Sequence, residues 1–346
     1  MPSRRITMQD IADACGLSRN TVSKVYNGRG SVPPSTRNLV LQKAKELGYG
    51  TPAGEQSASP VPVGNIALLT RYLPDRLHFG TLFLSSFTNI ISRAGYTLKM
   101  YETSPEELSR KELPPHFVPG QTAGIVGIEI FDQEYVNMLC RLGIPLVMTD
   151  SSPSTVTELI ECDYMTMENI AAVIAVINRL AGAGARNIGF VGDYNHCGSF
   201  RERWYGFQQG LMMNGLRYEK SFCICEPDSP IYTDHSWLMS RLDRMPSMPD
   251  AFVCANDYLA IPLMLTLKQR GLSVPRDVMI TGFDGTAQSA FTDPPLTTVT
   301  IHGTEIGLLA AELLLNRIRI PSFPYVWTHV KSSPVWRESI RGTESK

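Results

Sequence analysis

The sequence lacks any apolar run long enough to cross a membrane. Its most conspicuous apolar run, residues 170–177, is far shorter than the ~20 residues of a transmembrane helix. The first residues carry Arg4 and Arg5 but no apolar stretch after them, so we expect no signal peptide. These absences favour a cytoplasmic protein with no membrane partner.

The cysteines show no metal-binding or redox pattern. There are seven, an odd number, and none forms a C-x-x-C pair. Cys223 and Cys225 are one residue apart, without nearby His or Cys partners. Reduced, mostly buried thiols are expected. The full set is Cys15, Cys140, Cys162, Cys197, Cys223, Cys225 and Cys254.

Catalytic motifs are also missing. Asp193, His196 and Ser199 lie close in sequence, but no nucleophile elbow or phosphate-binding glycine loop accompanies them. The glycines of residues 182–185 precede an expected strand rather than follow one, which is typical of a helix end. We therefore predict no enzyme, no cofactor and no metal site.

The charge is divided unevenly along the chain. Its 346 residues are enough for two or three domains, and 43% of them are hydrophobic. Residues 1–50 hold eight Lys and Arg against three Asp and Glu, whereas the remainder holds 24 against 30. A basic head on an acidic body indicates that only the head meets a polyanion.

Three regions of the chain differ in hydrophobic periodicity and in composition. Residues 1–49 have a helical period, residues 50–63 form a linker rich in Pro, Gly and Ser, and residues 64–346 alternate buried strands with amphipathic helices. Strands are predicted at 65–70, 97–101, 124–128, 145–149, 187–191, 251–254 and 278–282. Helices are predicted at 82–94, 134–142, 167–181, 201–214, 258–270 and 304–318. This alternation predicts an α/β fold of two doubly wound sheets with a ligand cleft between them.

The head pattern predicts a helix-turn-helix. Thr7 is a suitable cap for a helix at 8–14 that Gly16 ends, and Ser18 caps a second helix at 19–26. Val22 and Val25 of the second helix face the core of the head. A third helix is expected at 36–47, capped by Ser35, with Val40, Ala44 and Leu47 packed inward.

The outer face of the second helix suits DNA. Arg19 can read guanine and Asn20 can read adenine by paired hydrogen bonds in the major groove. Lys24, Ser23 and Arg37, with the amide ends of the capped helices, suit phosphate. A generic three-helix bundle with a solvated basic face is the alternative.

The head closely resembles the LacI/GalR family of regulators. The matching residues are 6–12, 16–28, Val32, Thr36, Arg37 and 46–49. The resemblance implies a lambda-repressor-like, all-α head whose Arg19 and Asn20 read bases, with Lys24 further along. It implies that Thr21, Ser23 and Asn27 bind the DNA backbone or orient the helix. Thr7, Ser18 and Arg37 are the remaining residues of the predicted DNA-binding set.

The resemblance continues through the body, at residues 183–192, 203–207, 254–257, Gly271, 274–278, 282–285, 295–299 and 335–339. It implies a periplasmic-binding-protein-like clamp for effector binding and dimerisation. An N-subdomain is expected at about 64–161 and 291–321, and a C-subdomain at about 162–290 and 322–340. The three crossings are expected near 161–163, 287–295 and 321–324.

Polar side chains follow several predicted strands and identify an effector site. Asp284 and Asp150 are the strongest candidates, followed by Arg203 and Asn256, because carboxylate, amide and guanidinium groups can share the hydroxyls of a small polar molecule. Structural roles as helix caps or ion-pair anchors are the alternative. Four further residues are candidates for stacking on the ligand: His78, Phe79, Trp204 and Tyr232. A role as a core or surface residue is the alternative for each, and the sequence favours it.

The linker departs from the family pattern. The leucine and arginine of the usual hinge helix are missing, while Gly50, Pro52 and Gly54 oppose helix formation.

We expect a homodimeric repressor that binds a pseudo-palindromic operator in double-stranded DNA. Its effector is expected to be a sugar or sugar derivative; a purine-like or other small metabolite is the alternative. A solute-binding protein for import would need an export signal and would not need this head.

Overall fold

The computed structural model describes residues 7–27, 32–47, 64–71, 80–227 and 230–342. The chain divides into two compact units, a head at Met1–Val61 and a body at Pro62–Lys346. The predicted linker at 50–63 lies outside the described residues, as do His78 and Phe79. Within the described ranges, no helix has the length and hydropathy that a membrane span requires.

The head contains helices α1 (Met8–Cys15), α2 (Arg19–Asn27) and α3 (Pro34–Glu46). The predicted caps of the first two helices are confirmed. Thr7 accepts a hydrogen bond from the backbone of Asp10, and Gly16 ends α1 with a φ of 64°. The Ser18 hydroxyl accepts a hydrogen bond from the N–H of Thr21 at 3.2 Å. Both caps satisfy backbone groups that a helix end leaves unpaired.

The predicted start of the third helix is wrong by two residues. Ser35 does not cap it, because the helix begins at Pro34, whose fixed φ suits the first helical position. Val40 and Ala44 are buried as predicted, but Leu47 follows the end of the helix and is 36% exposed. The head core consists of Ile11, Ala12, Val22, Val25, Val40 and Ala44.

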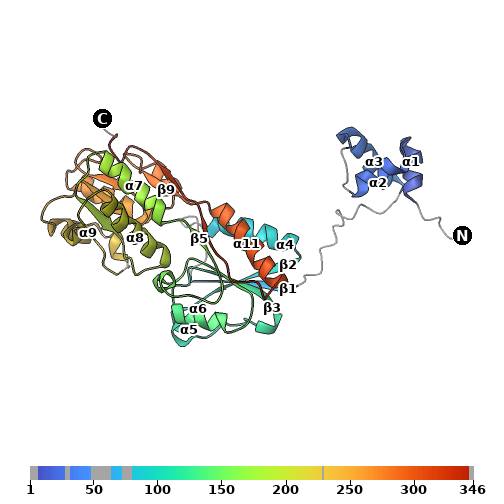
Figure 1. The fold of residues 1–346 in the computed structure, drawn as a ribbon, viewed down its shortest axis with the longest axis horizontal. Helices are drawn as coiled ribbons and strands as arrows, with labels where there is room; N and C mark the ends of the chain where they lie inside the picture. Colours follow the sequence, from blue (N-terminus) through green and yellow to red (C-terminus); the bar gives the residue numbers. More distant parts are fainter. Residues whose placement is uncertain (1–6, 28–31, 48–63, 72–79, 228–229, 343–346) are drawn as a thin grey trace. The chain divides into compact units, whose positions relative to one another are not determined.

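The body has two lobes. The N lobe is a parallel six-stranded sheet in the order β10-β5-β4-β3-β1-β2. Helices α4 (Gly80–Arg93) and α11 (Gly303–Arg319) cover one face, and α5 (Pro105–Arg110) and α6 (Gln133–Cys140) cover the other (Figure 1). Its strands are β1 (Gly64–Thr70), β2 (Tyr96–Glu102), β3 (Thr122–Ile128), β4 (Leu146–Thr149), β5 (Asp163–Met167) and β10 (Trp327–Val330).

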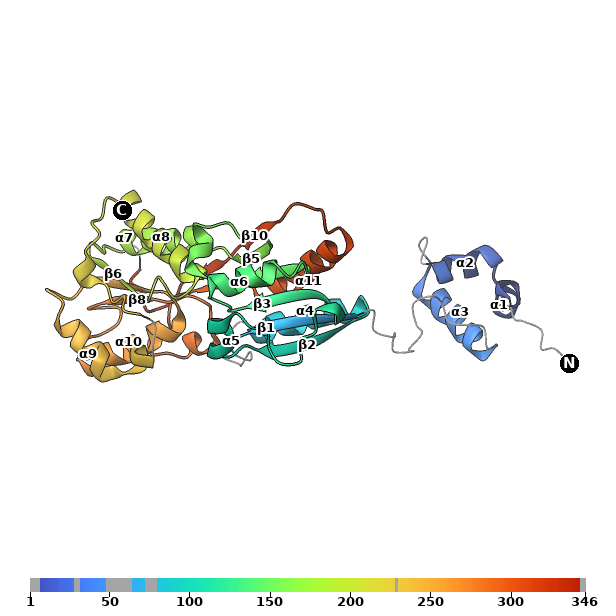
Figure 2. The ribbon, with the colours of Figure 1, turned by 90° about the horizontal axis from the view of Figure 1, so that it is seen from below.

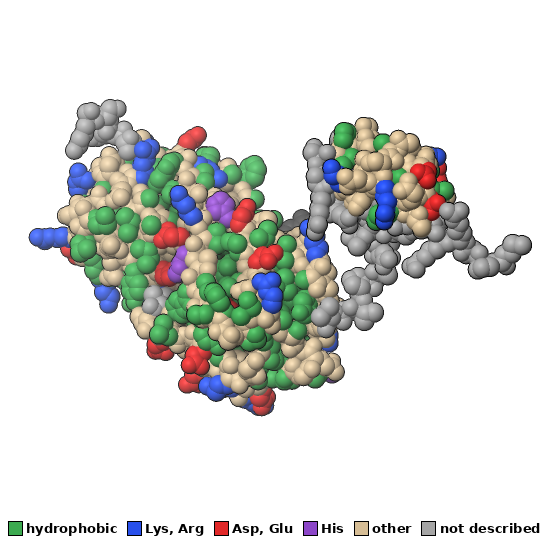
Figure 3. Space-filling model, turned by 45° about the vertical axis from the view of Figure 1, so that its right-hand side comes forward, with side chains coloured by type: hydrophobic (Ala, Val, Ile, Leu, Met, Phe, Trp, Pro, Cys, Tyr) green, Lys and Arg blue, Asp and Glu red, His purple; other side chains and the backbone are tan. Residues whose placement is uncertain are grey.

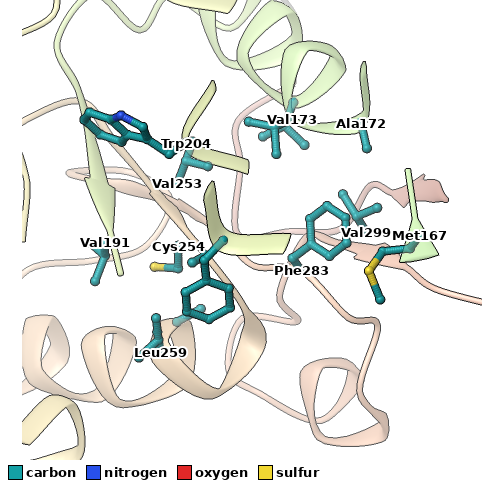
Figure 4. Packing of buried hydrophobic residues seen from close by; sticks show 14 of the residues in the cluster. Met167, Ala172, Val173, Val191, Trp204, Val253, Cys254, Leu259, Phe283 and Val299 are labelled. Atoms are coloured by element: carbon teal, nitrogen blue, oxygen red, sulfur yellow. The ribbon is translucent and has the colours of Figure 1, made fainter. Parts of the chain in front are cut away.

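The C lobe is a parallel sheet in the order β6-β7-β8, formed by Ile188–Val191, Ala251–Cys254 and Met279–Thr281. Helices α7 (Ile170–Gly182) and α8 (Gly198–Met213) lie on one face, with α9 (His235–Asp243) and α10 (Asp257–Gln269) on the other (Figure 2). Figure 4 shows the apolar packing inside this lobe, including Trp204 and Phe283. The short 3-10 helices of the body are η1 (Pro119–Gln121), η2 (Pro153–Val156), η3 (Lys220–Phe222), η4 (Pro230–Thr233) and η5 (Ala287–Ala290).

Three segments connect the lobes, and they lie later in the chain than the sequence predicted. The first runs from the end of β5 at Met167 to the start of α7 at Ile170. The second joins β9 (Thr298–Thr300) to α11, and the third joins β10 to β11 (Ser333–Val335). Strands β9 and β11 pair antiparallel with each other. Consequently residues 163–167 and 327–330 belong to the N-lobe sheet, not to the C-subdomain.

The physical reason is a buried charge. Asp163 is fully buried in β5, where the Arg317 guanidinium binds both of its carboxylate oxygens at 2.8 and 2.9 Å. An acidic residue at the start of a run reads as a strand boundary unless its partner is known. The partner is 154 residues away in sequence, so the sequence does not predict β5 and places Met167 in the next helix.

The expectation of mostly buried thiols is only partly met: Cys162, Cys197 and Cys254 are buried, and the other four are half-buried.

Candidate functional site

The head presents a polar face on α2. Arg19, Asn20 and Lys24 are exposed, while Val22 and Val25 of the same helix are buried. The helix therefore keeps its core contacts on one side and holds two base-reading side-chain types and one cation on the other. This arrangement is the one that a recognition helix requires.

The remaining predicted head residues divide into two kinds. Thr21 is half-buried, and its hydroxyl lies 2.9 Å from that of Ser18, so both help to start α2. Ser23 is half-buried and Arg37 is exposed on α3. Asn27 ends α2, and its side chain lies outside the described structure.

In the body, Asp150 joins the lobes. It follows β4 of the N lobe, and its Oδ1 accepts hydrogen bonds from the N–H groups of Ser151 at 2.9 Å and of Ser199 at 3.0 Å. Ser199 lies in the first turn of α8, and the neighbouring Gly198 N–H donates to the carbonyl of Ser151 at 2.8 Å. Burial raises the pKa of Asp150, and the hydrogen bonds from Ser199 oppose this shift. The loop after β4 thus caps a helix of the opposite lobe.

Arg203 on α8 is fixed on several sides. Its side chain is 3% exposed, and its Nη2 lies 3.2 Å from Oδ1 of Asp284. Nε donates to Asn169 at 2.9 Å, and Nη1 donates to the carbonyl of Ala255 at 2.6 Å. The guanidinium carbon lies 3.7 Å from the centre of the Phe283 ring. The structure thus brings together two predicted site residues, Arg203 and Asp284. It also places Asn169 and Phe283, which were not predicted, against Arg203.

Asp284 is the accessible member of this pair. Its side chain is 30% exposed, and its φ of 100° is unusual for a residue other than glycine. Asp150 also has a positive φ, 48°. Strained backbone of this kind concentrates at ligand-binding sites, where the surrounding structure holds it in place.

Asp257 fixes the loop that carries Asp284. It is fully buried and accepts hydrogen bonds from the Thr298 hydroxyl at 2.6 Å and from the Thr286 N–H at 2.8 Å. Burial, and then the charge of Asp284, raise its pKa to about 6. Asn256 beside it is half-buried and caps α10, because its Oδ1 accepts a hydrogen bond from the N–H of Leu259 at 3.0 Å.

The predicted stacking roles of Trp204 and Tyr232 are corrected. Trp204 is 7% exposed and stacks against Tyr194, with ring centroids 4.8 Å apart. Tyr232 is 1% exposed, and its hydroxyl donates to the carbonyl of Glu226 at 2.8 Å. Both rings belong to the C-lobe interior, because their apolar area is buried there.

A second polar layer lies behind Arg203. Asn169 Nδ2 donates to Glu202 Oε2 at 2.7 Å, and Glu202 Oε1 lies 3.2 Å from His329 Nε2. Sequence reasoning missed this layer, since Asn169, Glu202 and His329 come from three distant segments with no shared motif. Among the described residues, no group of three His, Cys, Asp or Glu side chains is placed to hold a metal ion.

Two family models match the chain. Residues 7–51 match the model of bacterial regulatory proteins of the lacI family, and residues 177–340 match a periplasmic binding protein-like domain. The HTH-type transcriptional regulator MalR of Streptomyces coelicolor is 28% identical over 321 residues, which cover 90% of each chain.

Solved structures show the same fold. The CelR–cellobiose complex superposes with a TM-score of 0.70 at 24% identity and covers 97% of this chain and 100% of that one. The lac repressor dimer bound to operator and the anti-inducer ONPF gives a TM-score of 0.67 at 22% identity, covering 98% and 100%. With the head, the two-lobed body and both family matches in agreement, the chain carries a DNA-binding head of the lacI family of bacterial regulatory proteins on a periplasmic-binding-protein-like body, and its relatives are transcriptional regulators.

Proposed function

We propose that the chain is a cytoplasmic transcriptional repressor whose affinity for operator DNA is set by a small sugar bound between the lobes of the body. The observation that carries the effector proposal is the Arg203–Asp284 pair, in which a buried guanidinium holds a carboxylate that is 30% exposed. Asp284 offers acceptor oxygens to hydroxyl groups, and Asp150 lies at the facing end of the other lobe. That CelR was solved with cellobiose supports the choice of a sugar.

A thermal-shift screen tests the effector. The full chain is heated with cellobiose, maltose, galactose, sugar phosphates and nucleobases in separate wells. A ligand at about one hundred times its dissociation constant stabilises the folded state by roughly 2.7 kcal/mol. We expect a sugar to raise the melting temperature of the wild type and of Asp243→Ala, which removes an exposed carboxylate of the same lobe, but not of Asp284→Ala. A shift from nucleobases alone would replace the sugar with a purine-like effector.

The DNA-binding proposal rests on Arg19, Asn20 and Lys24, which are exposed together on α2. Selection of duplexes from a random pool with the full chain should enrich a pseudo-palindrome, because two heads of a two-fold dimer read two half-sites. Enrichment of single, non-repeated sites would contradict the dimeric mode of binding. Thr7, Ser18, Thr21, Ser23, Asn27 and Arg37 are proposed as supporting contacts in the same complex.

The homodimer is supported by an apolar surface on the C lobe. Tyr258 and Leu265, seven residues apart on α10, are 58% and 49% exposed, and Phe291 after η5 is 87% exposed. Lys268 on α10 lies 2.9 Å from Asp293, so α10 and the segment after η5 are neighbours on this surface. Figure 3 shows that one face of the body carries hydrophobic side chains between charged ones. Large apolar side chains exposed on neighbouring segments are typical of protein interfaces.

Sedimentation tests the homodimer. Phe291→Glu places a charge in the proposed interface and should give monomers, whereas Leu159→Glu, at a site that is 90% exposed in the N lobe, should leave dimers. Equal dissociation of both variants, or of neither, would remove this surface from the proposal.

The linker at residues 50–63 also has a part in the proposed function. We propose that residues 50–63 couple body and head without the leucine that wedges into the minor groove in family members with a hinge helix. Hydrogen exchange of this segment with and without operator tests it, since strong protection in the complex would indicate a folded hinge.

A further inference from the structure

We propose that Asn169 and Glu202 are positioning residues for Arg203, and that Glu202 ties the orientation of Arg203 to His329 on β10. Within the proposed function, this makes the segments that connect the lobes part of the effector site. The proposal concerns how the site is held, and it stands on contacts among four side chains.

The contacts form one continuous series. Arg203 Nε donates to Asn169 Oδ1 at 2.9 Å, and Asn169 Nδ2 donates to Glu202 Oε2 at 2.7 Å. The other oxygen of Glu202 lies 3.2 Å from Nε2 of His329. At the opposite end, Arg203 Nη2 lies 3.2 Å from Asp284. A path of four polar contacts therefore leads from a surface histidine to the accessible carboxylate of the site.

The ends of this series belong to different lobes. His329 is in β10, which pairs with β5 in the N-lobe sheet, opposite Thr166. Glu202 and Arg203 are adjacent on α8 of the C lobe. Asn169 lies in the first connecting segment and also donates to the carbonyl of Met167 at 3.0 Å. A rotation of one lobe relative to the other must therefore stretch the Glu202–His329 contact or carry Asn169 with it.

Burial makes the series stiff. Asn169 is 1% exposed, Arg203 3% and Glu202 9%, so each polar group depends on its protein partners. At the far end from Asp284, His329 has 39% of its side chain exposed and exchanges protons readily with solvent. The carboxylates that face it are Glu202 on α8 and Glu168 after β5. Its Nε2 must carry a proton to donate to Glu202, and the charged imidazole binds that carboxylate more strongly than the neutral ring does.

The consequence concerns Asn169. A carboxylate that accepts from both Asn169 and a charged His329 is held at two points, and Asn169 is then fixed with its Oδ1 toward Arg203. Loss of the histidine charge weakens the contact between His329 and Glu202. The orientation of Arg203, and with it the geometry of Asp284, should follow the protonation of a residue that touches neither.

The test observes Arg203 directly and needs no effector. In the full chain with isotope-labelled arginine, the Nε–H resonance of Arg203 is assigned by its loss in Arg203→Lys. Its chemical shift is then followed from about pH 5.5 to about pH 8.5. We expect a titration with its midpoint above the ordinary histidine value of 6.5, because Glu202 raises the pKa of His329.

Matched variants decide the outcome. His329→Gln and Glu202→Gln should each abolish the step above pH 6.5. A step near pH 6 from Asp257, whose pKa is about 6 and whose charge acts on Asp284, should remain in both variants. His302→Gln should leave the step above pH 6.5 intact, since His302 lies in the second connecting segment and contacts Ser333 instead. A wild-type shift with no step above pH 6.5, or such a step that persists in His329→Gln, overturns the proposal. The exposed position of His329 keeps the test decisive if Glu202→Gln fails to fold. None of these outcomes depends on whether the effector is a sugar.

Discussion

The Asp150 carboxylate of the N lobe accepts a hydrogen bond from the backbone N–H of Ser199 in the C lobe, at 3.0 Å. Because Asp150 also accepts from Ser151 and is 8% exposed, removing it leaves buried donors without their acceptor. We expect Asp150→Ala to lower the free energy of unfolding by roughly 1–3 kcal/mol, measured by urea titration. Hydrogen exchange at Ser199 should accelerate in the same variant. An unchanged exchange rate would show that the lobes are held by other contacts.

The buried Arg317–Asp163 pair should matter far more than an exposed pair. Asp163 is fully buried, so Arg317→Leu leaves an uncompensated charge and should cost about 3–5 kcal/mol. Lys268→Ala breaks a pair whose partners are 66% and 87% exposed, and it should cost at most about 1 kcal/mol. Denaturant unfolding of both variants checks the difference. Similar losses for the two would contradict the assignment of Arg317 as the anchor of β5.

The stability of the body should depend on pH through His329. Its hydrogen bond with Glu202 raises the pKa of His329 above 6.5 in the folded state. A histidine with a raised pKa contributes stability that is fully present below pH 6.5 and is lost as the pH rises through the folded value. The melting temperature of His329→Gln should therefore fall below that of the wild type in acid and approach it at alkaline pH. A constant difference across this window would exclude the titration as its cause.

Arg19 and Lys24 should affect DNA binding in different ways. Arg19→Ala removes a side chain that can pair with a guanine edge, so we expect binding to weaken by roughly 1–3 kcal/mol, mainly for operators with the matching base. Lys24→Ala should weaken binding to all sequences alike and reduce its salt dependence. Fluorescence anisotropy with matched and mismatched duplexes distinguishes them. A uniform loss in Arg19→Ala would make Arg19 a phosphate contact.

The sequence was sufficient where the determinants are local. Caps at Thr7 and Ser18, the glycine that ends α1 and the buried strands of the first sheet all depend on neighbours within a few residues. It failed where a distant partner decides. Asp163 is tolerated inside β5 only because Arg317 reaches it, and Trp204 is a core residue because Tyr194 and Phe207 enclose it.

The same distinction applies to the candidate site. Asp150, Arg203 and Asp284 could be predicted because each lies at the end of a recognisable strand or at the start of a helix. The residues behind them could not. Asn169, Glu202 and His329 meet only after both lobes have formed, and no spacing in the sequence reports that meeting.

The place of β10 in the N-lobe sheet has a consequence for biosynthesis. This strand pairs with β5 across more than 150 residues of intervening chain, and it emerges from the ribosome only after nearly all of the C lobe. Until then, one edge of the N-lobe sheet is open, and Asp163 lacks the N–H of Val326 that binds it in the finished protein. The nascent chain must therefore carry an unpaired β5 edge through nearly half of its synthesis, and an open strand edge of this kind is a site that a chaperone protects.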